Sequence, residues 1–180
     1  EGRRIKALRT VVEQDVAIDH QSGPAADHFA DSVGVGWYPI DIHPVSADEV
    51  GTSTRTRPFQ IPLGALVPRR IENLLAANKN IGTTHITNGC YRLHPVEWNI
   101  GEAAGSLAAF ALDTGRKPKS VVKERELLRQ FQRGLLADGV PLSWLVDVPV
   151  GDPRFFVTQS LVMAGGYGEG AGALEFGPDL

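Results

Sequence analysis

The pattern of apolar and polar residues is clearest in the middle of the chain. Four consecutive apolar residues at 74–77 (LLAA) predict a short buried strand. The stretch 78–94 is polar and is expected to be a loop. Residues 95–112 are rich in small and apolar side chains and predict a helix, because Pro95 favours a first helical turn and Gly115 is a typical helix stop.

Shorter patterns flank this region, with extended segments before it and mainly helices after it. Alternating apolar residues predict strands at 1–12, 31–44 and 58–68, with a polar loop at 46–57. Apolar spacing predicts helices at 121–137 and 154–164, a short strand at 142–148, and a loose glycine-rich tail at 165–180. The expected fold class is α/β (α+β), with strands, a helix rich in small residues and one or two further helices.

Composition narrows the class of protein. The 180 residues are 42% hydrophobic and 22% charged, which is enough for one sizeable core. A net charge of −3 without a basic stripe argues against nucleic-acid binding. No apolar run approaches the ~20 residues that span a membrane, and no signal peptide is visible. Because the chain opens at Glu1 without Met, we expect the true N-terminus to be missing, and no compartment is predicted.

Polar side chains precede the central helix. His85, Arg92 and His94 lie shortly before its start. A helix N-terminus carries about half a positive charge, and Arg92 adds a full one, so this region would favour an anion or a polarised oxygen. An ordinary surface loop can have the same composition, and both interpretations stay open.

Two further patterns allow either packing or a ligand. In the strand expected at 31–44, Asp41 and His43 share one face, whereas glycines at 34 and 36 allow close approach of another backbone or a flat ligand. In the central helix, small residues recur four apart, so that this face could pack tightly or approach a flat cofactor. The three residues are Gly101, Gly105 and Ala109.

Other chemistries have weaker support. The spacing of Asp41, His43, His85 and His94 matches no zinc signature, and the single cysteine, Cys90, has no CxxC partner. We therefore predict no metal, and a lone cysteine is usually structural. There is no G-x-S-x-G elbow for serine hydrolysis. The glycines of the tail form neither a P-loop nor a dinucleotide fingerprint.

The central stretch, residues 73–112, contains the run Gly101-Glu102-Ala103-Ala104-Gly105 in its helix. It resembles the C-terminal flavin-binding segment of FAD-dependent oxidoreductases of the glutathione-reductase-like group. In that group a strand leads to a loop that touches the ribityl chain and pyrophosphate, and a helix with a G-x-A-A-G-like run starts under the flavin pyrimidine. The wider match is similar to a bacterial subfamily, some of whose members carry a xanthan-lyase label. The match is specific over 58–112 and looser at 31–44 and 139–149.

The resemblance implies FAD as cofactor and an oxidoreductase acting on a small molecule, such as a sugar or polyol. It implies that FAD contacts the loop made of Asn78, Lys79, Asn80, Ile81 and Gly82. The start of the helix would offer N–H groups to the flavin pyrimidine, at Trp98, Asn99, Ile100 and Gly101. For the substrate side the candidates by side-chain chemistry are Asp41, His43, His85 and Arg92, with histidine as acid or base and arginine orienting the substrate.

This chain departs from the group's pattern in two ways. Many relatives have Gly-Arg or Gly-Asp where this chain has Asn78-Lys79. The N-terminal G-x-G-x-x-G unit that binds the ADP half of FAD is absent from these residues, so we expect the C-terminal part of a longer flavoprotein, binding FAD weakly by itself. Three regions are expected: a substrate or cap-type β region (1–72), the C-terminal FAD-binding segment (73–115) and a helical C-terminal extension (116–180).

Two other functions stay open. One is a polysaccharide-lyase-like or carbohydrate-binding protein with a structural flavin or none, in which His43, His85 and Arg92 would act in proton abstraction beside a carboxylate. The other is a module in which the helix rich in small residues only packs. Flavin absorbance that bleaches with sugars or polyols would distinguish the flavin-dependent oxidoreductase from these two alternatives.

Overall fold

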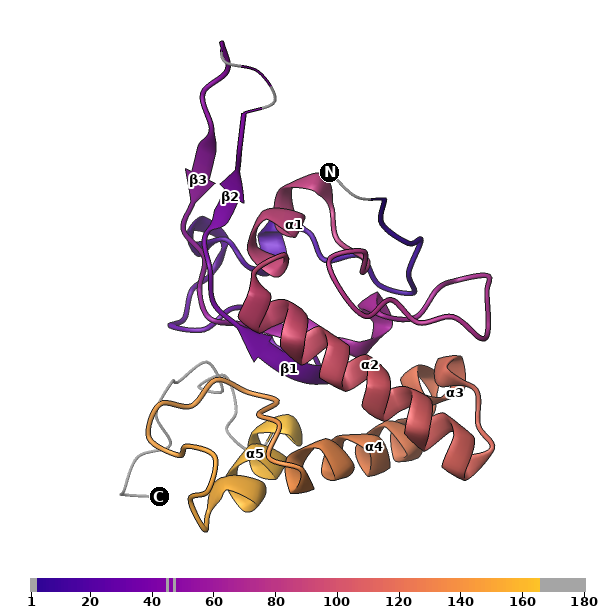
Figure 1. The fold of residues 1–180 in the computed structure, drawn as a ribbon. Helices are drawn as coiled ribbons and strands as arrows, with labels where there is room; N and C mark the ends of the chain where they lie inside the picture. The colour runs from indigo at the N-terminus through magenta and orange to yellow at the C-terminus, as the bar shows by residue number, and fades with distance from the viewer. Residues whose placement is uncertain (1–2, 45, 47, 166–180) are drawn as a thin grey trace.

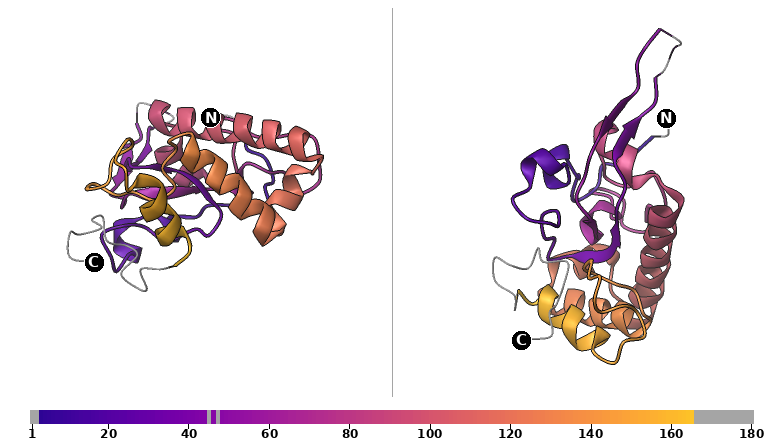
Figure 2. Two further views of the ribbon diagram at one scale, coloured as in Figure 1. Left: turned by 90° about the horizontal axis from the view of Figure 1, so that it is seen from below. Right: turned by 90° about the vertical axis from the view of Figure 1, so that its left-hand side faces the viewer.

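Two short antiparallel sheets form the β part of the molecule. The computed structural model describes residues 3–44, 46 and 48–165. Strand β1 (Ser32–Gly36) pairs with β4 (Phe59–Pro62), and β2 (Ile40–Ile42) pairs with β3 (Thr52–Thr54). The β2–β3 hairpin projects away from the rest of the chain (Figures 1 and 2).

The central helix α2 (His94–Thr114) packs along β1 and connects the sheets to the C-terminal helices. Pro95 lies in its first turn, and it ends at Gly115, which adopts the left-handed conformation at φ 64°. The glycines of β1 make the contact possible. A Cβ added at Gly34 would lie 1.5 Å from Oδ1 of Asn99. The bare face of the strand thus receives a helix side chain, not a flat ligand.

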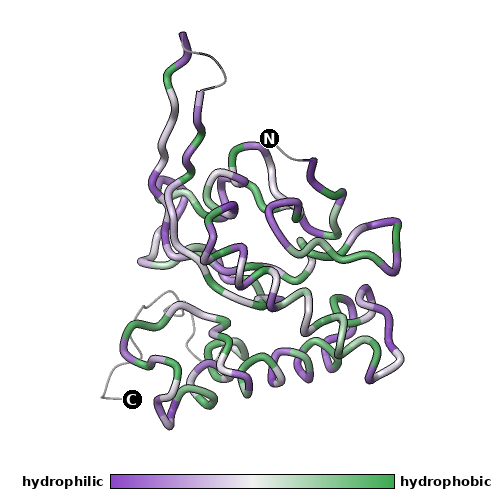
Figure 3. Tube along the Cα trace, in the orientation of Figure 1, coloured by the Kyte–Doolittle hydropathy of each residue, from purple (hydrophilic) through white to green (hydrophobic). Residues whose placement is uncertain are grey.

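The C-terminal part of the described chain is helical. Helix α3 (Pro118–Lys123) is followed by α4 (Arg125–Ala137) and, after an irregular segment, by α5 (Phe155–Met163). Helix α4 alternates hydrophobic and hydrophilic positions along its length, as Figure 3 shows. The apolar residues on one side of this helix are buried: Leu128, Phe131, Leu135 and Leu136. Short 3-10 turns lie at Glu13–Asp15, Ile18–His20 and Leu63–Ala65.

One hydrophobic core runs through the described residues, from Val11 in the N-terminal segment to Phe155 in α5. Near its centre the rings of Phe59 and Tyr91 stack with centroids 4.5 Å apart. Tyr91 is fully buried, and its hydroxyl donates a 2.7 Å hydrogen bond to the carbonyl of Gln60. The division into regions at 72 and 115 stays a prediction.

Several expected elements are confirmed and several are wrong. The helices at 95–112 and 154–164 and the strands within 31–44 and 58–68 are present. No strand forms at 74–77, where only Ala76 is fully buried, Leu75 is partly buried against the core and Leu74 is 43% exposed. The loop at 78–94 contains a short helix, the loop at 46–57 contains β3, and the helix at 121–137 is interrupted at Glu124.

The remaining differences concern extended segments. Residues 3–12 make only single bridges, such as Ala7 with Pro68, and 142–148 forms no strand. The tail expected to be loose lies outside the described residues beyond 165. None of the helices in the described part of the chain has both the length and the apolar character that crossing a membrane requires.

Candidate functional site

Helix α1 (His85–Tyr91) carries one side of the candidate site. Thr84 caps it by accepting a hydrogen bond from the N–H of Thr87, whose hydroxyl in turn accepts one from the N–H of Thr84. The hydroxyl of Thr87 also donates to the carbonyl of Val11, which fixes the helix to the N-terminal segment. The direction of α1, and hence the position of His85, is therefore set by local capping and one long-range bond.

Helix α1 packs directly on strand β2, and glycine is what allows this. A Cβ added at Gly89 would lie 2.8 Å from the carbonyl oxygen of Asp41 and 2.9 Å from its nitrogen. Any larger residue at Gly89 would therefore push the helix away from the strand. This approach brings the side chains at the end of β2 next to those of α1.

A pocket of about 280 Å³ lies at this contact. Its lining consists of Asp41, Ile42, His43, Pro44, His85, Asn88, Gly89 and Arg92. All four substrate-side candidates from the sequence are in this list, although they come from segments more than forty residues apart. His94, which belongs to the same sequence cluster, begins α2 and is absent from the lining.

Charged and polar groups in the pocket contact one another. Nε2 of His43 lies 3.0 Å from Oδ2 of Asp41, with 73% and 32% of the respective side chains exposed. A guanidinium N–H of Arg92 donates to the main-chain carbonyl of Asp41 at 2.9 Å. The pocket thus combines an imidazole held by a carboxylate with a fixed positive charge. Groups of this kind can transfer a proton and bind an oxygen-rich substrate.

The loop expected to contact FAD divides into exposed and buried residues. Asn78, Lys79 and Asn80 are exposed, whereas Ile81 and Gly82 are buried. A Cβ added at Gly82 would lie 2.3 Å from the carbonyl of Arg9, so this glycine serves packing of the N-terminal segment. The surface that this loop offers to a ligand therefore consists of its first three residues.

The loop and the pocket are joined by Asn88. Its side-chain amide donates to the carbonyl of Lys79 at 2.8 Å, and the same amide lies 3.3 Å from the hydroxyl of Thr83. Asn88 also lines the pocket and is only 4% exposed. Neither Asn88 nor Gly89 is among the site residues predicted from the sequence. The signal that could have found them is the Thr84–Thr87 capping pattern, which predicts a helix here.

The backbone N–H groups at residues 98–101, expected to face the flavin pyrimidine, are not free at the start of α2. The helix begins at His94, and the N–H of Glu97 already donates to the carbonyl of Leu93. The N–H groups of residues 98–101 therefore lie inside the helix, and the open ones lie in its first turn. Of the side chains, Trp98 is 73% exposed and Ile100 is buried.

Asn99 has a structural partner, because its Oδ1 accepts a 3.1 Å bond from the N–H of Val35. The helix face with small residues is open in the described chain. A Cβ at Gly101 would touch only the carbonyl of Ala77, at 3.4 Å, and one at Gly105 would meet nothing within 4 Å. The exposed loop at 78–80 and this open face thus border the same part of the surface.

Cys90 has no role as a nucleophile in this arrangement. It is fully buried, and its Sγ lies 3.2 Å from the carbonyl of Thr87. Burial raises the pKa of the Cys90 thiol to about 12, so the thiol stays protonated at neutral pH. Among the described residues, no group of three or more His, Cys, Asp or Glu side chains is arranged to hold a metal ion.

Comparison with known proteins adds the family. Curated proteins and solved structures give no match to the chain. A family model described as FAD dependent oxidoreductase matches residues 1–135, which is three quarters of the chain and includes the pocket, the loop at 78–82 and the start of α2. The chain therefore belongs to the FAD dependent oxidoreductase family.

Proposed function

We propose that this chain supplies one wall of the FAD site of a flavin-dependent oxidoreductase together with part of its substrate pocket. The family membership supports the cofactor and the class of reaction. The contact between the pocket and the FAD loop through Asn88 supports the arrangement. When bound, FAD would supply the two-electron acceptor.

The residues present fit a flavin wall. Asn78, Lys79 and Asn80 expose amide and ammonium groups that can bind ribityl hydroxyls and phosphate oxygens. Beside them the absent side chains at Gly101 and Gly105 leave open space along α2, where a flat ring could approach the backbone. The positive end of the α2 dipole would favour an electron-rich flavin edge near the first turn. Of the contacts proposed on this helix, Trp98 and Gly101 remain accessible, whereas Ile100 is buried and Asn99 is bound to Val35.

In the substrate pocket, histidine would act as acid or base and arginine would orient the substrate. The carboxylate of Asp41, 3.0 Å from the ring of His43, would hold this imidazole in position to accept a proton from a substrate hydroxyl. His85 lies in the same lining and is the second acid–base candidate. Arg92 uses one of its N–H groups on Asp41, and a guanidinium has five, so others could bind a substrate oxygen.

The substrate we propose is a sugar or polyol. A pocket of about 280 Å³ lies just below the usual range for small-molecule sites, about 300–1,000 Å³, which favours a compact ligand. Five of its eight lining residues carry hydrogen-bonding side chains, which suit a ligand rich in hydroxyl groups. We further propose that the ADP half of FAD is held by a dinucleotide-binding unit of the same protein, because no G-x-G-x-x-G occurs in these 180 residues.

The single observation that carries the proposal is the joint presence of Asp41, His43, His85 and Arg92 in one pocket. The test is anaerobic reduction of the flavin in the intact protein by candidate sugars and polyols. Replacing His43 with Gln should slow the bleaching by about 10²-fold or more at unchanged flavin content. The matched control is His20→Gln, at an exposed histidine outside the pocket, which should leave the rate unchanged.

A further inference from the structure

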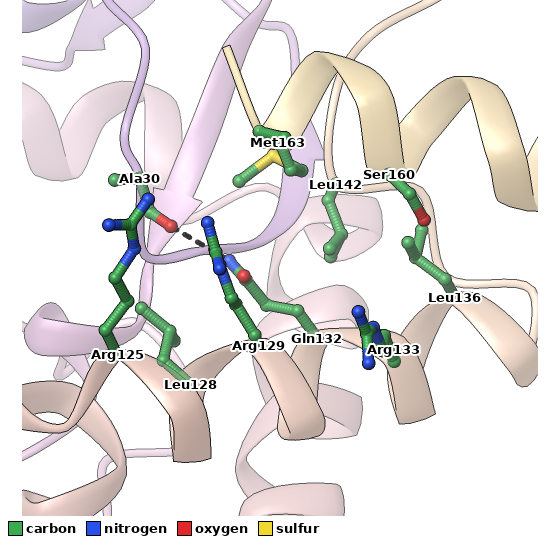
Figure 4. Close-up of a pocket in the computed structure, with 11 residues that line it drawn as sticks. Ala30, Arg125, Leu128, Arg129, Gln132, Arg133, Leu136, Leu142, Ser160 and Met163 are labelled. Atoms are coloured by element: carbon green, nitrogen blue, oxygen red, sulfur yellow. Dashed lines mark hydrogen bonds between the residues drawn. The ribbon is translucent and has the colours of Figure 1, made fainter. Parts of the chain in front are cut away.

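A larger pocket lies at the end of the molecule away from the β2–β3 hairpin. It has a volume of about 610 Å³ and is formed by α4, by the end of α5 and by the chain just before β1. Figure 4 shows these three elements around it, with Ala30, Arg129 and Met163 on different sides. It shares no lining residue with the pocket of Asp41 and His43.

Three arginines of one helix line this pocket. Arg125, Arg129 and Arg133 follow each other at intervals of four and so lie on one side of α4. In Figure 4 the side chains of Arg125 and Arg129 rise from the helix in the same direction, toward the side on which Ala30 lies. The pocket therefore has a row of guanidinium groups along one wall.

These positive charges are not neutralised within the part of the chain that the structure describes. Other basic side chains there do find carboxylates, such as Arg116 with Glu124 and Lys117 with Glu72. None of the three pocket arginines has an ion-pair or hydrogen-bond partner among the described residues. The three side chains are exposed to solvent, and like charges four residues apart on a helix repel weakly, so an anion bound between them would relieve this repulsion.

Most of the rest of the lining is apolar, with Gln132 and Ser160 as the polar exceptions. Leu128, Leu136, Leu142 and Met163 contribute aliphatic surface. Between them Gln132 donates to the carbonyls of Ala30 and Ser32, both at 3.0 Å, which ties α4 to the start of β1. The wall that carries the arginines is thus fixed to the sheet.

We propose that this pocket binds a small organic anion in which a phosphate or carboxylate group is attached to an apolar body. Guanidinium groups bind both oxyanions through paired N–H donors. The volume lies within the range of small-molecule sites, which argues for a small ligand over a flat macromolecular surface. The leucine and methionine side chains would cover the apolar part of the ligand.

The test is calorimetric titration of the intact protein with hexyl phosphate and hexanoate, with hexanol and inorganic phosphate as comparison probes. We expect saturable binding of hexyl phosphate or hexanoate, and the stronger of the two identifies the oxyanion. Hexanol and inorganic phosphate should each bind at least about tenfold more weakly, since each lacks one half of the recognised chemistry.

Two variants locate the binding. Arg129→Gln should weaken the stronger probe about tenfold through loss of a charge-assisted hydrogen bond. Lys123→Gln removes the same charge from an exposed position outside the lining and should leave the affinity unchanged. Circular dichroism of both variants checks their fold. The proposal is overturned if neither anion binds, if hexanol binds as tightly as the anions, or if both variants lose affinity equally.

Discussion

The side-chain amide of Asn88 donates a 2.8 Å hydrogen bond to the main-chain carbonyl of Lys79. One residue thereby connects two parts of the candidate site. Asn88 lines the pocket that contains Asp41 and Arg92, and Lys79 lies in the exposed loop proposed to contact FAD. The relative position of the substrate pocket and the cofactor loop therefore depends on a buried amide, which is a feature that mutation can test.

Replacing Asn88 with Ala should destabilise the protein and loosen the loop. The variant removes the donor of a part-buried hydrogen bond to the carbonyl of Lys79, which should cost about 0.5–1.5 kcal/mol of unfolding free energy. If the loop contacts FAD, the ratio of flavin to protein absorbance after purification should also fall. Urea unfolding and the absorbance spectrum measure the two effects.

The control for this variant is Asn73→Ala, at an exposed asparagine outside the pocket. It should change neither stability nor flavin content. Equal stability of Asn88→Ala and Asn73→Ala would show that the amide does not hold the loop.

Replacing Gly89 with Ala should separate α1 from β2. The added methyl group would lie 2.8–2.9 Å from backbone atoms of Asp41, which cannot move as a flexible side chain could. We expect a loss of about 1–3 kcal/mol from overpacking. Gly134→Ala is the matched control, because this helical glycine has nothing within 4 Å of the new Cβ. The control should gain up to about 1 kcal/mol from helix propensity. Thermal unfolding gives both values, and a stabilised Gly89→Ala variant would refute the close contact.

Asn99 tests the attachment of α2 to the sheet. Asn99→Ala removes the acceptor for the N–H of Val35 and should cost about 1–3 kcal/mol. Asn99→Asp retains an acceptor oxygen at the same place and should recover most of the loss. Denaturant unfolding measures the free energy of unfolding of the two variants. If aspartate is as damaging as alanine, the bond to Val35 is not what asparagine contributes.

Cys90 links stability to alkaline pH. Burial raises the pKa of its thiol to about 12, whereas the thiol of the unfolded chain ionises near pH 8.5. Below pH 8.5 the thiol is protonated in both the folded and the unfolded state, so its ionisation does not change the free energy of unfolding. Above it the unfolded chain releases its proton first, so the free energy of unfolding falls as the pH rises toward 12. At pH 10 the loss should reach about 2 kcal/mol relative to pH 7.5.

The measurement compares wild type with Cys90→Ala by urea unfolding at pH 7.5 and pH 10. Between pH 7.5 and pH 10, the free energy of unfolding of the wild type should fall by about 2 kcal/mol more than that of the variant. A thiol reagent at pH 8 should label Cys90 only after unfolding. Rapid labelling of the folded protein would contradict the burial of this side chain.

Local pattern was sufficient for the elements whose signals lie within a few residues. Helix α2 could be predicted because Pro95 and Gly115 mark its two ends. The strand expected at 74–77 fails because burial depends on neighbours in space. Ala76 lies against Leu66, because the N–H of Ala76 donates a 2.9 Å hydrogen bond to the carbonyl of Leu66, whereas Leu74 is 43% exposed. Composition alone cannot distinguish these two apolar residues.

In the candidate site, too, local sequence pattern predicts some features, whereas others depend on contacts between distant segments. Period-two alternation correctly places Asp41 and His43 on one face, as their 3.0 Å contact shows. Their approach to Arg92 depends on the backbone contact at Gly89, between segments far apart in sequence. No local pattern encodes such a contact. Asn88 bonds to Lys79 only nine residues earlier, but the capping pattern of Thr84 and Thr87 predicts a helix without showing what the side chain of Asn88 contacts.

Anaerobic titration of the intact protein with sugars and polyols, with the flavin absorbance followed, tests whether this chain forms part of a flavin and substrate site. The protein should be yellow, and its flavin bands should bleach with at least one of these substrates. Arg92→Gln should raise the substrate concentration for half-maximal bleaching by about tenfold or more. A colourless protein, or bleaching that is unaffected when Asp41, His43 and Arg92 are replaced in turn, would contradict this assignment.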